Sequence, residues 1–199
     1  MDLIFDINGT LTEHNSSIKQ STRLLIEDLC EKHRVILISG VSYESILEKI
    51  DTLYYKVNAV YAKSGNEKYM NDKVIYSKRV FFDAEEAKWI DDIIDGDVRI
   101  EQCRMVLTDV VNKEKTCDRI EERYPHLSCC INTNGDEIHI LRRDSDKTQI
   151  IHEYHGALFF TDGPEKYQYD YTLAQRLVTR KVESPSDLPQ LLKKIQLFL

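Results

Sequence analysis

Residues 3–12 read LIFDINGTLT, and this stretch points most directly to the class of fold that we expect. An apolar run, Leu3–Phe5, ends at the carboxylate of Asp6, and the turn-forming residues Asn8-Gly9-Thr10 follow. An apolar run without polar alternation is typical of a strand that is covered on both faces. A carboxylate at the end of such a strand lies where ligands bind in open α/β sheets.

Alternating strand and helix patterns continue from this first strand. Helical recurrence of leucine and isoleucine predicts a helix over 21–31, and the apolar runs at 35–38 and 57–62 predict two further strands. Ser42 can cap a helix between these two strands, and a hairpin is expected around Asn71-Asp72. The order strand–helix–strand–helix–strand indicates an α/β fold with a parallel, Rossmann-like core.

The middle of the chain has a different pattern, which indicates a small α+β insert that covers the ends of the strands. Asp83 and Glu86 have the spacing of a capping box at the start of a helix. The elements that we expect in the insert are a helix over 83–94, strand material over 98–111, a helix over 114–124 and a strand over 127–131.

After the insert, the chain is expected to return to the parallel sheet with the apolar positions of 138–141. The elements expected after that are a helix over 147–154, a buried strand over 157–160 and a last helix that opens at 186–187. The sequence therefore predicts two domains, a core domain of residues 1–82 and 134–199 and a cap domain of residues 83–133.

The composition is that of an ordinary soluble globular protein, with 42% hydrophobic and 31% charged residues in a chain of 199. No stretch is long and apolar enough to span a bilayer, and the first residues lack the pattern of a signal peptide. The five cysteines form no C-x-x-C pair, which favours reduced thiols and predicts a cytoplasmic protein without a membrane partner. The formal charge of −7 argues against a nucleic-acid partner, and the oligomeric state stays open.

Residues that are suited to phosphoryl transfer lie at the ends of predicted strands or at the start of a predicted helix in four places. They are Asp6 and Ser39 after the first two strands, Lys147 at the start of a helix, and Asp162 after a late strand, with Asp170 eight residues on. A carboxylate can attack phosphorus and split one hard step into two through an aspartyl-phosphate. A hard cation held by carboxylates neutralises the phosphoryl charge, while a hydroxyl and an ammonium bind the remaining oxygens. The four segments therefore predict a phosphoryl-transfer site.

The order of these motifs resembles that of the haloacid dehalogenase superfamily. The first motif of that superfamily is usually D-x-D-G-T, and residues 6–10 are Asp-Ile-Asn-Gly-Thr here. Ala62-Lys63-Ser64-Gly65 and Phe159-Phe160-Thr161-Asp162 are similar to segments of the phosphomannomutase and sugar-phosphatase branch, which has an α+β cap in the place of the insert. The resemblance covers essentially the whole chain. It implies a Mg²⁺-dependent phosphatase, a hydrolase of small phosphorylated molecules such as sugar phosphates.

The resemblance also implies a role for each site residue. Mg²⁺ would be held by Asp6, Asp162 and the backbone carbonyl of Asn8, with Asp170 in the outer shell, and Ser39 and Lys147 would hold the phosphate. The other residues expected at the substrate are Gly9, Thr10, Gly40 and, from the cap, Arg104. Tyr167, Tyr169 and Tyr171 are interpreted as packing residues of the loop after Asp162, with stacking on a ligand as the alternative.

Position 8 departs from the family, because asparagine replaces the aspartate that acts there as general acid and base. Asn8 cannot give a proton to a leaving alkoxide, and general acid–base catalysis contributes about 10²–10⁴-fold. One hypothesis is therefore a slow phosphatase. The alternative is a protein that binds a phosphorylated ligand with little catalysis, in a regulatory role, and a third is an asparagine introduced to trap a complex. A phosphosugar mutase is less favoured, because it needs the same proton transfers.

Overall fold

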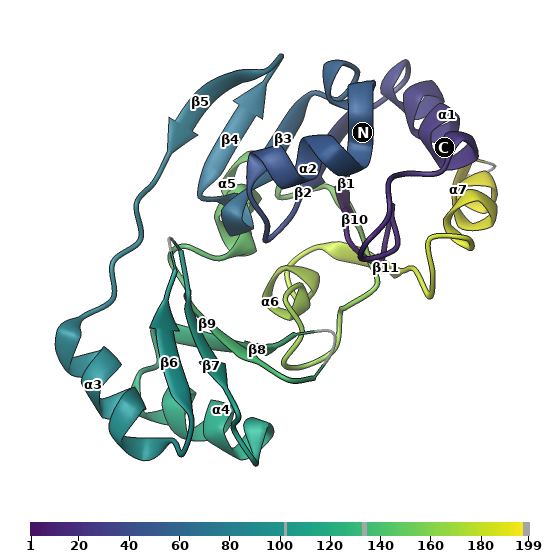
Figure 1. The fold of residues 1–199 in the computed structure, drawn as a ribbon. Coiled ribbons are helices and arrows are strands. Elements are labelled where there is room, and N and C mark those ends of the chain that lie inside the picture. Colours follow the sequence, from purple (N-terminus) through teal and green to yellow (C-terminus); the bar gives the residue numbers. More distant parts are fainter. Residues whose placement is uncertain (102, 133–134, 197–199) are drawn as a thin grey trace.

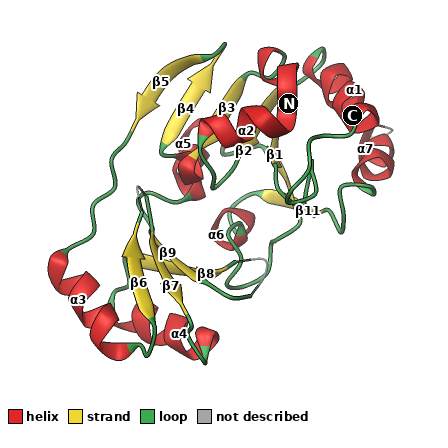
Figure 2. Ribbon diagram, in the orientation of Figure 1, coloured by secondary structure: helices red, strands yellow, loops and turns green. Residues whose placement is uncertain are grey.

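Two β-sheets form the structure, a computed structural model that describes residues 1–101, 103–132 and 135–196. The seven-stranded sheet and its helices form the upper part of Figure 1, and the four-stranded sheet with two helices forms the lower part. Two connections, residues 78–83 and 143–146, join these parts (Figure 2). The predicted α/β core with an inserted α+β cap is confirmed.

The large sheet is parallel at its centre, and its strand order is β11-β10-β1-β2-β3-β4-β5. The parallel strands are β1 (Asp2–Asp6), β2 (Arg34–Ile38), β3 (Ala59–Ala62), β10 (Leu158–Thr161) and β11 (Val178–Lys181). The predicted hairpin around Asn71-Asp72 is present as the antiparallel strands β4 (Glu67–Met70) and β5 (Lys73–Ser77). Because β1, β2 and β10 run in the same direction, Asp6, Ser39 and Asp162 meet at one edge of the sheet.

Alternate side chains of the central strands are buried against helices on the two faces of this sheet. Phe5 and Phe160 stack with ring centroids 4.5 Å apart on one face, and Ile4 and Phe159 are fully buried on the other. The first face is covered by α1 (Gln20–Cys30), α2 (Tyr43–Ile50) and α7 (Leu188–Gln196), and the second by η3 (Lys147–Ile150), α5 (Ile151–Tyr154) and α6 (Tyr171–Ala174). Burial of each such side chain contributes about 1.5–3 kcal/mol, which is why these strands are apolar throughout.

The remaining short helices of the core are η1 (Asp51–Tyr55) and η2 (Lys63–Gly65). Ser42 caps α2 as the sequence predicts, because its side chain accepts from the N–H of Ser45 at 3.4 Å. None of the described helices is long and apolar enough to cross a membrane.

The small sheet is antiparallel, with the order β6-β7-β9-β8. The elements of this part are α3 (Ala84–Ile93), β6 (Asp97–Ile100), β7 (Met105–Thr108), α4 (Lys113–Arg123), β8 (Leu127–Ile131) and β9 (Ile138–Arg142). Both helices cover one face, where Ile90, Leu107 and Ile120 are buried together. The predicted capping box of Asp83 and Glu86 opens α3.

The prediction that positions 138–141 rejoin the parallel sheet is wrong. These residues form β9, which pairs with β7 and β8 in the small sheet. Ile138 and Ile140 face the cap helices, while His139 faces the opposite way. An apolar pattern of this kind suits a strand in either sheet, because it does not specify the partner strand. The predicted boundary between 133 and 134 lies outside the described residues, and we propose that the second core segment begins after Arg142.

Two short elements, α6 and β11, are absent from the sequence prediction. α6 has four residues, and β11 is a largely exposed edge strand with the sequence VTRK, so neither has an apolar pattern that marks it. The predicted helix over 147–154 is η3 followed by α5. The last helix begins at Leu188, directly after the expected opening at 186–187, and is described as far as Gln196.

Candidate active site

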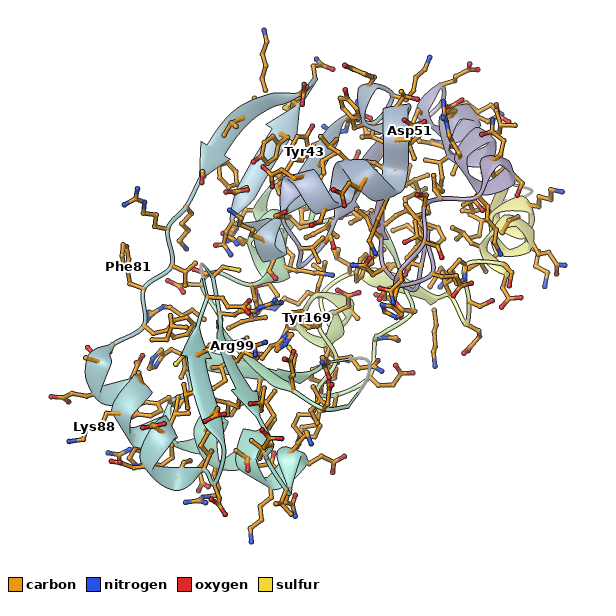
Figure 3. All side chains as sticks on the ribbon, in the orientation of Figure 1. Tyr43, Asp51, Phe81, Lys88, Arg99 and Tyr169 are labelled. Carbon is orange, nitrogen blue, oxygen red and sulfur yellow. The ribbon has the colours of Figure 1, made fainter. Side chains whose placement is uncertain are left out.

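A cavity of about 460 Å³ lies between the strand ends of the large sheet and the open face of the small sheet. It is lined by Asp6, Asn8, Ser39, Gly40, Lys147, Asp162 and Asp170 from the core and by Arg104, Ile131, Asn132 and His139 from the cap. Tyr169, from the loop between Asp162 and Asp170, lies between the two parts (Figure 3). The structure thus brings the predicted site residues into one cavity, except for Gly9 and Thr10, which do not line it.

The Asp6 carboxylate at the end of β1 is paired with a buried ammonium. Lys147 Nζ lies 2.5 Å from Asp6 Oδ1 and also donates to Asp170 Oδ1. Asp6 is 5% exposed and Lys147 is 3% exposed, so the buried ammonium is stable only because the carboxyl groups of Asp6 and Asp170 lie against it. Lys147 begins η3, which is capped by Asp146 through the N–H of Thr148 at 2.8 Å. The short helix therefore directs the ammonium to the end of β1.

Three carboxylates lie close enough together to share a metal ion. Asp6, Asp162 and Asp170 each offer one oxygen, and these oxygens lie within 4.8 Å of one another. Asp170 is held by Thr161, whose hydroxyl donates to Asp170 Oδ2, and Asp162 accepts from the hydroxyl of Thr10 at 3.2 Å. Carboxylate oxygens at this spacing fit a hard divalent cation such as Mg²⁺.

Gly9 and Thr10 contribute to this cluster by placing Asp162. Gly9 has φ +82°, and a Cβ built on it would lie 2.1 Å from Asp162 Oδ2. The Thr10 hydroxyl accepts from the N–H of Asp162 at 3.0 Å in addition to its contact with the carboxylate. The turn after β1 therefore needs a glycine for two reasons, its backbone conformation and the approach of Asp162.

We expect Gly9→Ala to lower the affinity for Mg²⁺ by about 10-fold or more, because Asp162 must move away from the new methyl group. The positive φ adds about 1–2 kcal/mol of strain to the folded state. Isothermal titration with Mg²⁺ and urea unfolding measure the two effects. Gly135→Ala is the matched control, since Gly135 has φ +74° and nothing within 4 Å of a built Cβ. An unchanged Mg²⁺ affinity in Gly9→Ala would contradict the expectation that Asp162 helps to hold a metal ion.

Ser39 and Gly40 follow β2 at the same edge of the sheet. The Ser39 N–H donates to the carbonyl of Tyr61 at 2.9 Å, and its own carbonyl accepts from the N–H of Ser64 at 2.9 Å. These bonds fix the backbone, so the hydroxyl of Ser39, a buried residue, points to the cavity. Gly40 lies beneath the ring of Tyr169, which a built Cβ would approach to 3.5 Å.

Asn8 has a partner that the sequence motifs do not reveal. Lys49 Nζ donates to Asn8 Oδ1 at 2.5 Å, and Asn8 Nδ2 donates to Ser39 Oγ at 3.4 Å. Lys49 lies in the last turn of α2, where a cation is ordinary because it interacts favourably with the helix dipole. The local sequence therefore contains no signal that this lysine reaches the site.

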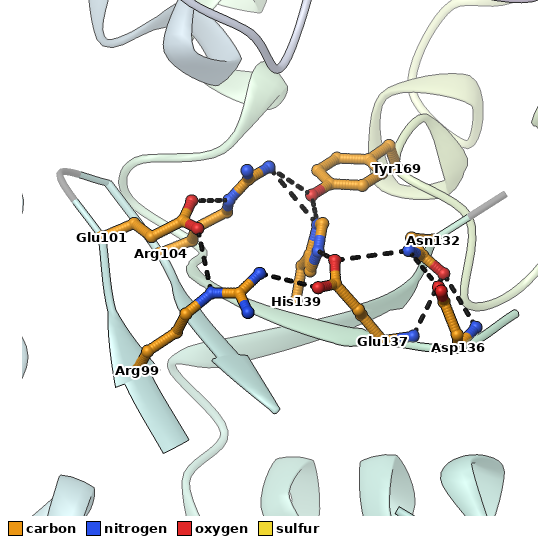
Figure 4. A network of polar contacts seen from close by, with 8 residues as sticks. All are labelled: Arg99, Glu101, Arg104, Asn132, Asp136, Glu137, His139 and Tyr169. Atoms are coloured by element: carbon orange, nitrogen blue, oxygen red, sulfur yellow. Dashed lines mark hydrogen bonds and ion pairs between the residues drawn. The ribbon is translucent and has the colours of Figure 1, made fainter. Parts of the chain in front are cut away.

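The cap side of the cavity is a network of charged and polar groups (Figure 4). Arg104 donates from Nη1 to the hydroxyl of Tyr169 at 2.9 Å and from Nε to Glu101 at 2.7 Å. His139 Nδ1 contacts the same hydroxyl, and its Nε2 lies 2.9 Å from Glu137. Arg104 thus reaches the cavity as predicted, although it is already paired. His139 is absent from the predicted site because the apolar pattern of 138–141 predicts a strand of the large sheet. Tyr169 is predicted to pack within its loop, whereas in the structure it lines the cavity.

The loop between Asp162 and Asp170 is attached to the cap. The N–H of Ile131 donates to the carbonyl of Tyr167 at 2.7 Å, and the Tyr167 hydroxyl donates to Asp118 at 2.6 Å. Lys166 Nζ lies 3.2 Å from the same carboxylate. The segment that carries two carboxylates of the cluster is therefore held by cap residues as well as by the core.

Burial and mutual repulsion change the protonation of the acidic cluster. Burial, assisted by the neighbouring charges of Asp170 and Asp162, raises the pKa of Asp6 to about 8, although Lys147 opposes this change. The pKa of Asp162 is raised by burial and by Asp170. Burial alone would lower the pKa of Lys147, but the two carboxylates more than reverse this, and the ammonium stays charged. Without a metal, one ammonium serves three carboxylates, so the cluster holds an extra proton.

We expect the metal-free protein to lose stability as the pH rises from about 4 to about 8. The folded state keeps the Asp6 proton up to about pH 8, while the unfolded chain releases it near 3.8, so unfolding releases a proton in this window. The free energy of unfolding in EDTA should fall across this window, by about 1 kcal/mol for each pH unit. Mg²⁺ held by the same carboxylates would compete with this proton and should stabilise the protein more at pH 8 than at about pH 5.5. Urea unfolding measures both effects, and Asp6→Asn should lack this part of the pH dependence.

No known protein family and no curated protein matches the chain in sequence. Solved structures do match over nearly its whole length. A mutant of Plasmodium falciparum IMP-nucleotidase bound to IMP superposes with a TM-score of 0.73 and 15% identity, covering 98% of this chain and 68% of the nucleotidase.

Two further structures match in length as well as in fold. The HAD subclass IIB sugar phosphatase BT4131 has a TM-score of 0.66 and 12% identity, with 99% of this chain and 98% of the phosphatase covered. Aspergillus fumigatus trehalose-6-phosphate phosphatase has a TM-score of 0.62 and 10% identity, with 97% and 91% covered. Identities this low establish a shared fold, and the chemistry must be argued from the residues of the cavity.

Proposed function

We propose that this chain, which has the fold of the haloacid dehalogenase superfamily, is a Mg²⁺-dependent phosphatase that acts through an aspartyl-phosphate on Asp6. One observation carries the proposal: the oxygens of Asp6, Asp162 and Asp170 lie within 4.8 Å of one another in a cavity that also contains Lys147 and Ser39. This set provides a nucleophile, a cation site, an ammonium and a hydroxyl for one phosphoryl group.

Each group has a part in the proposed reaction. Mg²⁺ would be held by Asp6, Asp162 and the backbone carbonyl of Asn8, and when bound it neutralises the charge of the phosphoryl oxygens. Asp6 attacks phosphorus, while Ser39 and Lys147 donate to the phosphoryl oxygens. Asp170 holds the Lys147 ammonium beside Asp6 and lies at the edge of the cation site. Because all of these groups are fixed by backbone bonds or ion pairs, they need little rearrangement when the substrate binds.

The substrate that we propose is a small phosphorylated molecule. The structural neighbours are a nucleotidase of IMP, a sugar phosphatase and a phosphatase of trehalose 6-phosphate, and their names support this class, with sugar phosphates as one candidate. Arg104, His139 and Tyr169 line the cap side of the cavity and would contact the part of the substrate beyond its phosphate. We also propose a cytoplasmic location, which five unpaired cysteines support.

A second candidate function is a phosphate-ligand-binding or regulatory protein with little catalysis. The observation that favours it is the Asn8 side chain, which cannot transfer protons and whose oxygen is occupied by Lys49. Mutase activity stays less favoured for the same reason.

A phosphatase screen separates the two functions. The native protein is assayed against small phosphorylated compounds with Mg²⁺ and with EDTA, and mass spectrometry tests for a phosphorylated Asp6 during turnover. Mg²⁺-dependent release of phosphate that needs Asp6 supports the phosphatase. Tight binding of a phosphorylated compound without its hydrolysis, unchanged by Asp6→Asn, would support the binding protein.

A further inference from the structure

Lys49 is a cation without a carboxylate partner at the edge of the proposed site. Its Nζ donates to Asn8 Oδ1 at 2.5 Å and to the backbone carbonyl of His14. Among the residues that the structure describes, no carboxylate oxygen lies within 4.0 Å of this ammonium. An ammonium has three N–H donors, so one donor and the whole positive charge remain for a ligand.

The other cations around the cavity are already paired with carboxylates. The pairs are Lys147 with Asp6 and Asp170, Arg104 with Glu101, and Lys166 with Asp118. Lys49 differs from these cations because no ion pair reduces its charge, so this charge can act on a negative group that forms nearby.

A second cavity, of about 620 Å³, extends from the first one past Asn8. Asn8, His14, Val41 and Asn132 line both cavities, and Lys49 lines the second. The remaining lining residues of the second cavity are the uncharged polar residues Asn15, Ser16, Ser17 and Ser45 and the acidic residue Glu48. A ligand whose phosphoryl group lies at Asp6 can thus extend past Asn8 to the ammonium of Lys49.

Lys49 also determines which way the Asn8 side chain faces. Because an ammonium can only donate, the carboxamide oxygen of Asn8 must face Lys49, and its NH₂ group then points to Ser39 Oγ, 3.4 Å away. In this orientation Asn8 can donate a hydrogen bond to an oxygen of the substrate but cannot transfer a proton to it. A leaving group that departs beside Asn8 therefore carries its negative charge with it.

We propose that Lys49 and Asn8 form the subsite for the departing oxygen and that the substrates are phosphorylated compounds whose leaving group is a stable anion. Acyl phosphates, aryl and enol phosphates and phosphoanhydrides share this chemistry, and alkyl phosphates do not. The proposal rests on the phosphatase function proposed above and specifies its substrate class. The proposal predicts that sugar phosphates, whose leaving groups are alkoxides, are hydrolysed more slowly than these compounds.

The reaction balances without a general acid. Asp6 forms a bond to phosphorus, the bond from phosphorus to the bridging oxygen breaks, and the electron pair leaves with that oxygen as an anion beside Asn8, whose carboxamide oxygen contacts Lys49. Water then attacks the phosphorus of the aspartyl-phosphate, and the bond to Asp6 breaks with its electron pair returning to the carboxylate. Both hydrogens of the water stay on the released phosphate, which leaves as H₂PO₄⁻ and gives up one proton to solvent at neutral pH. The fixed charge of Lys49 stabilises the departing anion in the first step.

The test is a comparison of kcat/KM across leaving groups. One set of substrates is a series of substituted phenyl phosphates. The pKa values of their phenol leaving groups span several units, up to the pKa of about 10 of an unsubstituted phenol. Acetyl phosphate, pyrophosphate and glucose 6-phosphate represent acyl, anhydride and alkyl leaving groups. The proteins are the native chain, Lys49→Met, Lys49→Arg and, as a matched control, Lys56→Met, which removes an exposed lysine directly after η1. Inhibition by inorganic phosphate reports on the phosphoryl site alone.

We expect the rate of the native protein to rise steeply as the pKa of the leaving group falls. Lys49→Met should lower kcat/KM by about 10- to 100-fold for phenyl phosphate and by much less for the best leaving groups, because they need less stabilisation. Lys49→Arg should retain most of the native kcat/KM. Inhibition by inorganic phosphate should be the same in the native protein and in both variants of Lys49.

An equal loss for every substrate, together with weaker inhibition by phosphate, would mean that Lys49 only holds Asn8 and His14 in place, and the proposal would be wrong. It would also be wrong if the native protein hydrolysed glucose 6-phosphate as fast as acetyl phosphate. If no compound is hydrolysed in a manner that depends on Asp6, the phosphatase function itself fails, which is a different result from these two.

Discussion

Asp6→Asn should lower phosphatase activity by about 10⁴-fold or more while the fold is kept, because loss of a nucleophile removes the covalent step. Asparagine has the same shape as aspartate, and its carbonyl oxygen can still accept from Lys147, which lies 2.5 Å from Asp6 Oδ1. The variant should therefore unfold at a urea concentration close to that of the native protein. Mass spectrometry should detect a phosphorylated peptide containing residue 6 in the native protein only.

The matched control for this prediction is Asp2→Asn, at the other end of β1. Asp2 is paired with Arg34 at the surface, 2.5 Å from its Nη2, so the change removes the same charge from the same strand without touching the cavity. Its activity should equal that of the native protein. Full activity in Asp6→Asn would show that another group is the nucleophile or that the measured activity is a contaminant.

Asn8→Asp should raise the hydrolysis of alkyl phosphates by about 10²–10⁴-fold, because it introduces the general acid and base that position 8 lacks. Lys49 donates to this side chain, and its ammonium favours the charged carboxylate. We therefore expect a gain at the lower end of that range, and a larger gain in the double variant Asn8→Asp, Lys49→Met. The measurement is kcat for glucose 6-phosphate with Mg²⁺ in each variant.

Asn112→Asp is the matched control for the change at position 8. Asn112 caps α4 by accepting from the N–H of Lys115 at 3.2 Å, a role that aspartate fills equally well. This variant adds the same charge at a residue that does not line the cavity and should leave activity unchanged. If Asn8→Asp binds Mg²⁺ and phosphate but shows no gain on any substrate, the site lacks more than a proton donor, and the regulatory binding function becomes the better explanation.

Asp6, Ser39 and Asp162 can be recognised from the sequence alone, because each one follows a run of apolar residues that is typical of a strand buried on both faces. The ends of parallel strands meet at one edge, so three local patterns predict one site. Lys147 can be added from the order of the motifs. The structure places these four side chains in one cavity, and it gives Gly9 and Thr10 a different position from the expected one, behind Asp162.

Local sequence is sufficient to predict most of the buried strands, the caps at Ser42 and Asp83 and the residue types at the strand ends. These features depend on neighbours within a few residues along the chain, so a local pattern contains them. Tertiary packing was needed to assign 138–142 to the small sheet, to bring Lys49 to Asn8 across 41 residues, and to turn His139 and Tyr169 toward the cavity. The choice of partner strand and the meeting of distant side chains depend on long-range contacts, which no local periodicity encodes.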